Sequence, residues 1–206
     1  MRVPVPALFL ASALATPLLA SGEVGILLDK QFGKAQSVAV GQMVASGNYD
    51  SVSPSGVGFR VGTSFLDLGV MSVGVNATYH PKAEEDLKWN GAKVGKVGME
   101  YAAVGAGLDW KLLLNLHAGI EIRRERISGE LPLPGGGGII SGNSTSTRPW
   151  MKLGVGFVAP LPLVSPFVRL ELAMPTTKTD KTGTPDDLRQ ALAPQFQVAL
   201  YGGIRF

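Results

Sequence analysis

Alternation of apolar and polar residues at a spacing of two is the feature that most constrains the fold of this chain. In about eight segments after residue 22, one parity is apolar and the other is small, polar or charged. The last segment is the clearest, with Phe196, Val198, Leu200, Gly202, Ile204 and Phe206 on one face and Gln195, Gln197, Ala199, Tyr201, Gly203 and Arg205 on the other. A period of two is that of a β-strand, so the chain is predicted to be all-β.

The predicted strands have lengths that suit a membrane-spanning barrel. They cover about residues 23–32, 57–65, 71–79, 94–109, 112–125, 148–159, 165–175 and 195–206. A tilted strand of about 9–11 residues crosses a bilayer. Beyond the first 22 residues, Asp109 and Lys111 interrupt the longest apolar run before it reaches the roughly 18 residues of a spanning helix, which excludes a helical membrane protein.

The connections between these strands are expected to alternate between long and short. The long ones are predicted at 33–55, 80–93, 127–147 and 176–194, and the short ones around Asp67, Asp109–Trp110 and 159–164. This is the layout of a barrel with short periplasmic turns and long external loops. Strands 94–109 and 112–125 face their polar parities inward together only if the turn at Asp109–Lys111 has an even number of residues, so a two-residue turn is predicted.

Aromatic residues are expected to form two girdles at the membrane interfaces. The turn end would carry Phe65, Trp110, Phe157 and Phe206, and the loop end Phe32, Tyr79 and Phe196. Ordinary core aromatics of a soluble β-sandwich are the alternative interpretation, because aromatic residues favour strands in any case.

The first segment has the pattern of a secretory signal. Arg2 precedes an apolar run from Val3 to Ala20 that only Pro, Ser and Thr interrupt. Residues 1–22 are therefore predicted to be a signal peptide and 23–206 the barrel, with an uncleaved anchor helix as the alternative. Cleavage after Ala15, Ala20 or Gly22 suits the small residues, and the sequence does not choose among them.

With these residues in view, the chain resembles the small eight-stranded outer-membrane barrels, the OmpA-transmembrane and OmpX-like group. The segment Gln195–Phe206 carries the resemblance, because a terminal Phe on an alternating strand is what the outer-membrane assembly machinery reads in that group. The resemblance implies an eight-stranded antiparallel up-and-down transmembrane barrel in the cell outer membrane, with Phe196, Tyr201 and Phe206 as the assembly signal. It also implies contact with outer-membrane lipid and lipopolysaccharide, and an unidentified surface ligand at the loops. No peptidoglycan-binding domain follows Phe206, so cell-wall tethering is not expected.

The chemistry-bearing residues favour a protein that is not an enzyme. The chain has no cysteine and two histidines, His80 next to Pro81 in a predicted loop and His117 on the predicted inward face. Neither is part of a catalytic or metal-binding pattern. The glycine run 135–138 lacks the Lys-Ser/Thr of a phosphate-binding loop, so no cofactor is predicted. The formal charge of +3 arises from interleaved acids and bases, which does not favour nucleic-acid binding.

Charged residues on the predicted inward faces suggest what fills the barrel. They include Asp29, Arg60, Lys96, Glu100, Glu121, Arg123, Glu125, Lys152, Arg169, Glu171 and Arg205. In the strand 94–109 this assignment turns Val97, Met99, Tyr101 and Ala103 toward lipid. An eight-stranded barrel has room for little beyond its own side chains, so these charges are expected to pair and plug the lumen. The favoured role is structural or surface-interacting. The alternative is a narrow channel or carrier for small solutes or hydrophobic ligands, and a lipid-modifying barrel enzyme is less favoured.

Overall fold

The computed structural model describes residues 21–33, 36–37, 48–132, 139–161, 163–177 and 193–206. The predicted signal peptide, residues 1–22, lies outside the described residues except for Ser21 and Gly22. Within the described ranges, no helix is long and apolar enough to cross a membrane.

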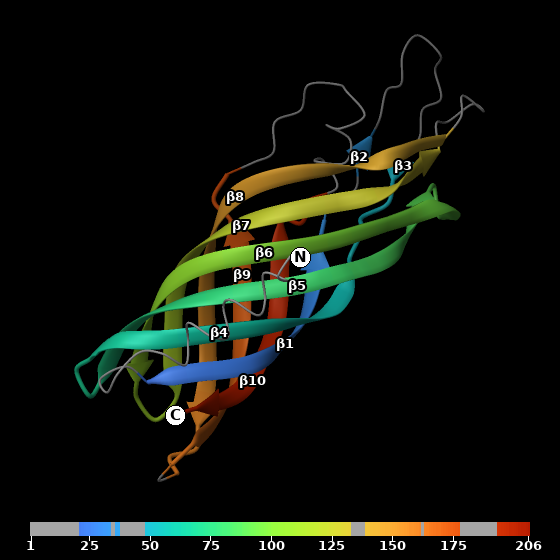
Figure 1. The fold of residues 1–206 in the computed structure, drawn as a ribbon. Helices are drawn as coiled ribbons and strands as arrows, with labels where there is room; N and C mark the ends of the chain where they lie inside the picture. The colour runs from blue at the N-terminus through green and yellow to red at the C-terminus, as the bar shows by residue number, and fades with distance from the viewer. Residues whose placement is uncertain (1–20, 34–35, 38–47, 133–138, 162, 178–192) are drawn as a thin grey trace, which may run out of the picture.

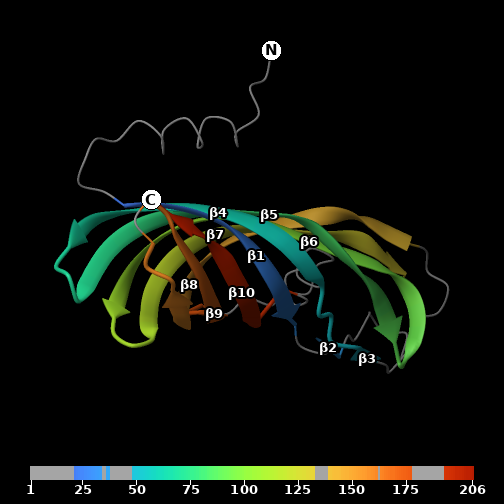
Figure 2. The same ribbon diagram turned by 90° about the horizontal axis from the view of Figure 1, so that it is seen from below.

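Eight strands close into a ring (Figure 1). They are β1 (Gly22–Phe32), β4 (Ser55–Asp67), β5 (Met71–Trp89), β6 (Ala92–Lys111), β7 (Asn115–Pro132), β8 (Ile139–Val158), β9 (Ser165–Pro175) and β10 (Phe196–Arg205). Each pairs antiparallel with the next strand of the ring, and β1 closes it by pairing with β10. Two short strands, β2 (Gln36–Ser37) and β3 (Asn48–Tyr49), join the end of β5. The predicted eight-stranded antiparallel up-and-down barrel is confirmed. Figure 2 shows the curvature of its strands in a view from below.

The strands of the ring differ in length by nearly a factor of two. β5 to β8 have 19, 20, 18 and 20 residues, whereas β1, β9 and β10 have 11, 11 and 10. Pairing of β5 with β4 stops at Tyr79 and pairing of β8 with β9 stops at Trp150, so the long strands continue beyond the ring. We call this projecting part, residues 82–100, 126–132 and 139–145, the extension; it runs to the upper right in Figure 1.

Strand structure replaces two of the expected loops. β5 continues to Trp89, turns at Asn90–Gly91 and returns as β6, so the loop predicted at 80–93 is wrong. The turn residues have φ of 48° and 80°, values that Asn and Gly adopt readily in two-residue hairpins. Most of the loop predicted at 127–147 is likewise paired between β7 and β8, and residues 133–138 lie outside the described part.

The face assignment of β6 is also wrong, and a turn explains why. β6 is joined to β7 by three residues, 112–114, and Lys111 pairs with Asn115, so odd-numbered residues face inward in both strands. A two-residue turn at Asp109–Trp110 would have reversed the parity. Val97, Met99, Tyr101 and Ala103 therefore face the lumen instead of the lipid, and all four are buried.

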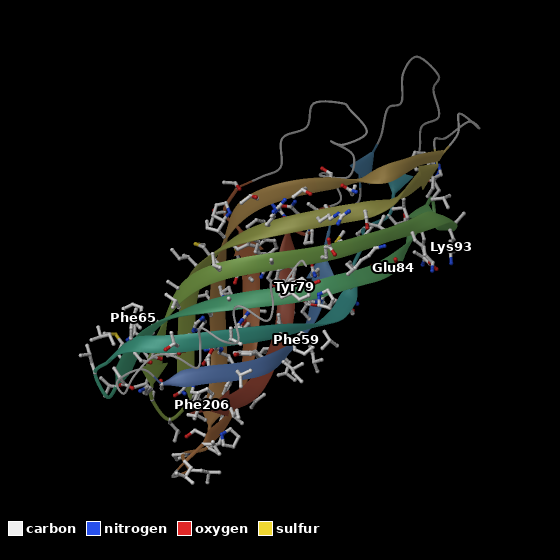
Figure 3. The ribbon with its side chains drawn as sticks, viewed as in Figure 1. Phe59, Phe65, Tyr79, Glu84, Lys93 and Phe206 are labelled. Atoms are coloured by element: carbon white, nitrogen blue, oxygen red, sulfur yellow. The ribbon has the colours of Figure 1, made fainter. Side chains whose placement is uncertain are left out.

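Side chains are distributed in the opposite sense to those of a soluble protein. The outer surface exposes large apolar residues on every strand, among them Ile26, Phe59, Val75, Val104, Ile120, Leu153, Val168 and Leu200. The interior holds Arg60, Glu121, Arg123, Lys152 and Glu171, none more than 2% exposed. Phe65 and Phe206 mark the turn end of the apolar band, Phe59 and Tyr79 its loop end, and Glu84 and Lys93 lie beyond it on the extension (Figure 3). Of the other predicted girdle residues, Trp110 and Phe157 are exposed, while Phe32 and Phe196 are half-buried.

Candidate functional site

The turn end of the lumen holds a cluster of ion pairs drawn from five strands. Asp109 on β6 accepts hydrogen bonds from Arg169 at 2.9 Å and Arg205 at 3.2 Å. Arg205 also donates to Glu23 at 3.0 Å, and the His117 ring lies 2.9 Å from Asp109. Both cations thus bridge β9 and β10 to carboxylates on β6 and β1, which ties together strands that are not all neighbours in the ring.

The middle of the lumen is organised around Glu171. This carboxylate accepts hydrogen bonds from Arg60 at 2.6 Å and from Arg169 at 2.8 Å. Both guanidinium groups lie over the ring of the buried Tyr201, at 4.6 and 5.3 Å from its centroid. Arg60 comes from β4 and Glu171 from β9, so this pair spans the barrel interior.

The Glu171 group forms one layer of ion pairs across the lumen, and a second layer, around Glu121, lies nearer the loop end. Glu121 is paired with Arg123 on its own strand and with Lys152, whose Nζ is 2.7 Å away. The Arg123 guanidinium stacks 3.9 Å from the Trp150 ring centroid and 4.5 Å from that of Tyr101. It also donates to Gln197 on the far side of the ring, so this layer crosses the lumen as well.

Asp29 and His80 complete this layer. His80 Nε2 lies 2.9 Å from Asp29, and the His80 ring stacks on Tyr101 with centroids 5.1 Å apart. Gln197 donates to Asp29 and, at 3.0 Å, to the Tyr101 hydroxyl. His80 was predicted in an external loop, but it lies on β5 with no exposed surface.

A cluster of buried apolar residues lies at the loop end of the barrel, above these charges. Inward-facing side chains of the extension pack against two other segments of the chain, one between β3 and β4 and one just before β10. The buried members are Val52, Leu87, Val97, Met99, Ile127 and Ala193, and we call them the mouth cluster. Just below, Arg148 pairs with Glu125 at 2.7 Å and donates to the Pro194 carbonyl, which holds the segment before β10 over the lumen.

The structure brings together most of the predicted lumen charges but not all of them. Those it places inside the barrel are Asp29, Arg60, Glu121, Arg123, Glu125, Lys152, Arg169, Glu171 and Arg205. Lys96 and Glu100 are corrections: Lys96 is exposed, and Glu100 faces outward toward Arg126 at 3.3 Å. The reversed face of β6 accounts for both. Glu23 and Asp109 were missed, because Glu23 lies at the start of a strand and Asp109 was assigned to a turn.

A hollow of about 20 Å³ lies among the lumen side chains near Glu23, Asp109 and His117, enough for roughly one water molecule. Among the described residues, no three His, Asp or Glu side chains are grouped so that they would hold a metal ion.

The three residues predicted to form the assembly signal have different surroundings. Phe206 is exposed on the outer surface, and its backbone exchanges two hydrogen bonds with Gly22, of 2.8 and 3.0 Å. Phe196 packs against Phe32, with ring centroids 6.0 Å apart. Tyr201 is fully buried in the lumen.

The outer face of the extension is charged, in contrast to the band below it. Lys82 pairs with Glu84 at 2.6 Å and Lys93 with Asp86 at 2.8 Å. Hydrogen bonds from these lysines lower the pKa of both carboxyl groups below their ordinary values. A polar hollow of about 540 Å³ lies here, and its lining includes Lys82, Lys93, Lys96, Gly98 and Ser128.

A closed sheet without lateral edges, apolar outside and charged inside, satisfies its backbone internally as a bilayer requires. These features define the chain as a transmembrane β-barrel of the outer-membrane type.

Solved structures with a similar chain course include three outer-membrane or surface proteins. Ail, the attachment invasion locus protein of Yersinia pestis, solved with the heparin analogue sucrose octasulfate, is 12% identical with a TM-score of 0.48, covering 91% of this chain and 97% of its own. Neisserial surface protein A is 14% identical with a TM-score of 0.48, covering 90% and 95%. A major outer membrane protein from Thermus thermophilus is 14% identical with a TM-score of 0.48, covering 89% and 98%. No protein-family model matches the sequence, and no functionally curated protein matches it.

Proposed function

We propose that this protein is a non-enzymatic, non-conducting barrel of the outer membrane that acts at the cell surface through its extension. The observation that carries the proposal is the set of ion pairs that cross the barrel interior. Two layers of ion pairs span the barrel, and the mouth cluster covers them on the loop side.

The pairing of the lumen charges favours a plug over a channel. A conducting pore needs polar walls around water, whereas here Arg60 and Glu171 reach each other across the interior at 2.6 Å. Arg123 is held by a carboxylate, an amide and two aromatic rings at once. Opening a path through these layers would separate buried charges, which costs several kcal/mol for each group left unpaired.

The extension is the part of the barrel best placed to meet a ligand. It is paired strand structure, which gives a more rigid surface than a loop of the same length. Its outer face carries charges of both signs and a hollow of about 540 Å³. An unidentified surface ligand at this face is therefore part of the proposal.

Delivery to the membrane is the remaining part of the proposal. The N-terminal segment acts as the signal peptide, and cleavage after Ala15 or Ala20 would keep Gly22 in the mature chain, where its backbone pairs with Phe206. Phe206, with Phe196 and Tyr201 on the same strand, is read by the assembly machinery. Deleting Phe206 should lower the amount of heat-modifiable barrel in outer-membrane fractions, whereas deleting Gly91 at the tip of the extension should not.

Single-channel recording of the refolded protein in planar bilayers tests the plug. We expect no stable conductance steps from the parent. Replacing residues 85–97 with Asn-Gly, which joins the register partners Glu84 and Gly98, should shorten the extension and leave both ion-pair layers in place. This variant should stay non-conducting yet lose attachment of expressing cells to a test surface. Ion-selective steps from the parent would instead establish the channel or carrier alternative.

A further inference from the structure

An apolar hollow of about 830 Å³ lies on the outer surface across five neighbouring strands, β4 to β8. Two rows of register partners line it. They are Val61, Ala77, Val104, Ile122 and Pro149 in one row and Thr63, Val75, Ala106, Ile120 and Met151 in the next. Ala77 and Ala106 are short beside neighbours such as Ile120 and Ile122, which are at least half exposed. The surface therefore dips where lipid chains contact the barrel.

The row directly above the hollow marks the membrane interface. It contains Phe59, Tyr79, Ala102, Arg124 and Thr147 as register partners. Phe59 and Tyr79 are about half exposed aromatic residues, the kind that lie at headgroup level (Figure 3). Arg124 points outward at the same level.

Arg124 differs from the other arginines of its strand. Arg123 pairs with Glu121, and Arg126 pairs with Glu100 at 3.3 Å. Arg124 is exposed and has no carboxylate partner among the described residues. An unpaired guanidinium at headgroup level is suited to a phosphate, which it contacts through two parallel hydrogen bonds.

The polar hollow of the extension continues the same face. It lies beyond the Arg124 row on β5, β6 and β7, and it is lined by Lys82, Glu84, Lys96 and Ser128 among others. The outer surface thus presents, in order toward the loop end, an apolar hollow, the Arg124 guanidinium and a polar hollow. An acyl chain, a phosphate and a sugar headgroup follow one another in the same order in a phosphorylated glycolipid.

We propose that this face binds one phosphorylated glycolipid of the outer leaflet, with an acyl chain in the apolar hollow, its phosphate on Arg124 and its sugars against the extension. The site rests on the proposed surface location of the extension. It favours a glycolipid over a phospholipid because a small headgroup would end at Arg124 and leave the polar hollow empty.

Lipid retention in nanodiscs tests the site. The parent and variants are refolded in phosphatidylcholine nanodiscs that contain a few per cent of a bis-phosphorylated lipid A carrying core sugars, and the glycolipid retained after detergent extraction is counted by native mass spectrometry. Arg124→Gln should lower retention about tenfold, the usual effect of losing one charge-assisted contact. The matched control is Lys30→Gln, because Lys30 is an exposed outward cation on β1, on the opposite side of the ring.

A second pair of variants tests the apolar part. Ala77→Leu fills the hollow and should reduce retention several-fold, whereas Ala118→Leu, on the lipid-facing side of β7 outside the hollow, should leave it unchanged. Phosphatidylglycerol offered in place of the glycolipid should be retained less well by the parent than the glycolipid is, because its headgroup reaches Arg124 but not the polar hollow.

Two results would overturn the proposal: equal retention by the parent and Arg124→Gln, or equal retention of phosphatidylglycerol and glycolipid by the parent. Conductance is measured on the same samples. Conductance by the parent would contradict the proposed plug. If the parent does not conduct and Arg124→Gln retains as much glycolipid as the parent, only the lipid site is contradicted.

Discussion

The long wall, β5 to β8, and the short wall, β1, β9 and β10, share one barrel but serve two environments. Within the bilayer both walls present apolar side chains outward and paired charges inward. Beyond the membrane interface only the long wall continues, and there its outer face is charged while its inner face carries Leu87, Val97 and Met99. The same strands therefore reverse their pattern along their length, because the solvent outside changes from lipid to water.

The largest expected effect tests the lumen that both walls share. Arg123→Ala should destabilise the barrel by about 3–5 kcal/mol, because it leaves Glu121 buried with fewer cationic partners. Reversible urea unfolding in lipid vesicles measures the change. A loss below roughly 1 kcal/mol would mean that water reaches this layer and that the lumen is not dry.

Lipid-facing charge should affect both walls alike. Leu153→Arg on β8 and Leu170→Arg on β9 should each cost about 2–4 kcal/mol if they lie near the midplane, because both side chains face the bilayer core. The same unfolding experiment applies. If Leu153→Arg left the free energy of unfolding unchanged while Leu170→Arg lowered it, the membrane interface on the long wall would lie closer to the turn end than its aromatic residues indicate.

The tip of the extension should respond more weakly. Gly91→Ala places a Cβ at a φ of 80° and should cost about 1 kcal/mol through local strain. Asn90, at a φ of 48°, tolerates its conformation better, so Asn90→Gly serves as the comparison and should be close to neutral. Protease susceptibility of residues 88–93 on intact cells reports the loosened turn before global unfolding does.

The smallest effect is expected on the outer face of the extension. Lys93→Ala removes an exposed ion pair with Asp86 and should leave the unfolding midpoint unchanged, since exposed pairs contribute little. It should also return the pKa of Asp86 toward its ordinary value, a rise that NMR titration detects. A marked loss of stability would mean that the extension supports the barrel rather than being carried by it.

The sequence predicted the barrel because alternation is dictated by the two faces of each strand within the bilayer. It failed where that rule changes. In residues 80–99 the inward face becomes apolar and the outward face charged. If every strand is assumed to face lipid, such a charged outward face does not fit a strand, so the segment was predicted to be a loop. The Asn90–Gly91 dipeptide was a local hairpin signal that would have located the turn. The reversed face of β6 followed from one miscounted turn, 112–114, because a single residue of register turns every side chain to the other side.

The partners of each lumen charge were beyond sequence reasoning for a different reason. Parity identifies which side chains point inward, but not their height, because the strands are tilted and staggered in a closed barrel. Arg60 and Glu171 meet although 111 residues separate them, and nothing in their local sequence indicates it. Asp109 meets Arg169 and Arg205 only because the turn after β6 lies three residues later than predicted.

The seam between β1 and β10 has a consequence for how the barrel forms. Its partners, such as Glu23 and Arg205, are separated by 182 residues, so the contact that closes the ring is among the most distant in the chain. A growing or partly assembled chain is an open sheet with two unpaired edges, which lipid does not tolerate and which invite pairing with other chains. Loop-closure entropy further delays this contact. Insertion should therefore be all-or-none, and any factor that holds the two edges apart from other chains until they meet would control the yield of the folded barrel.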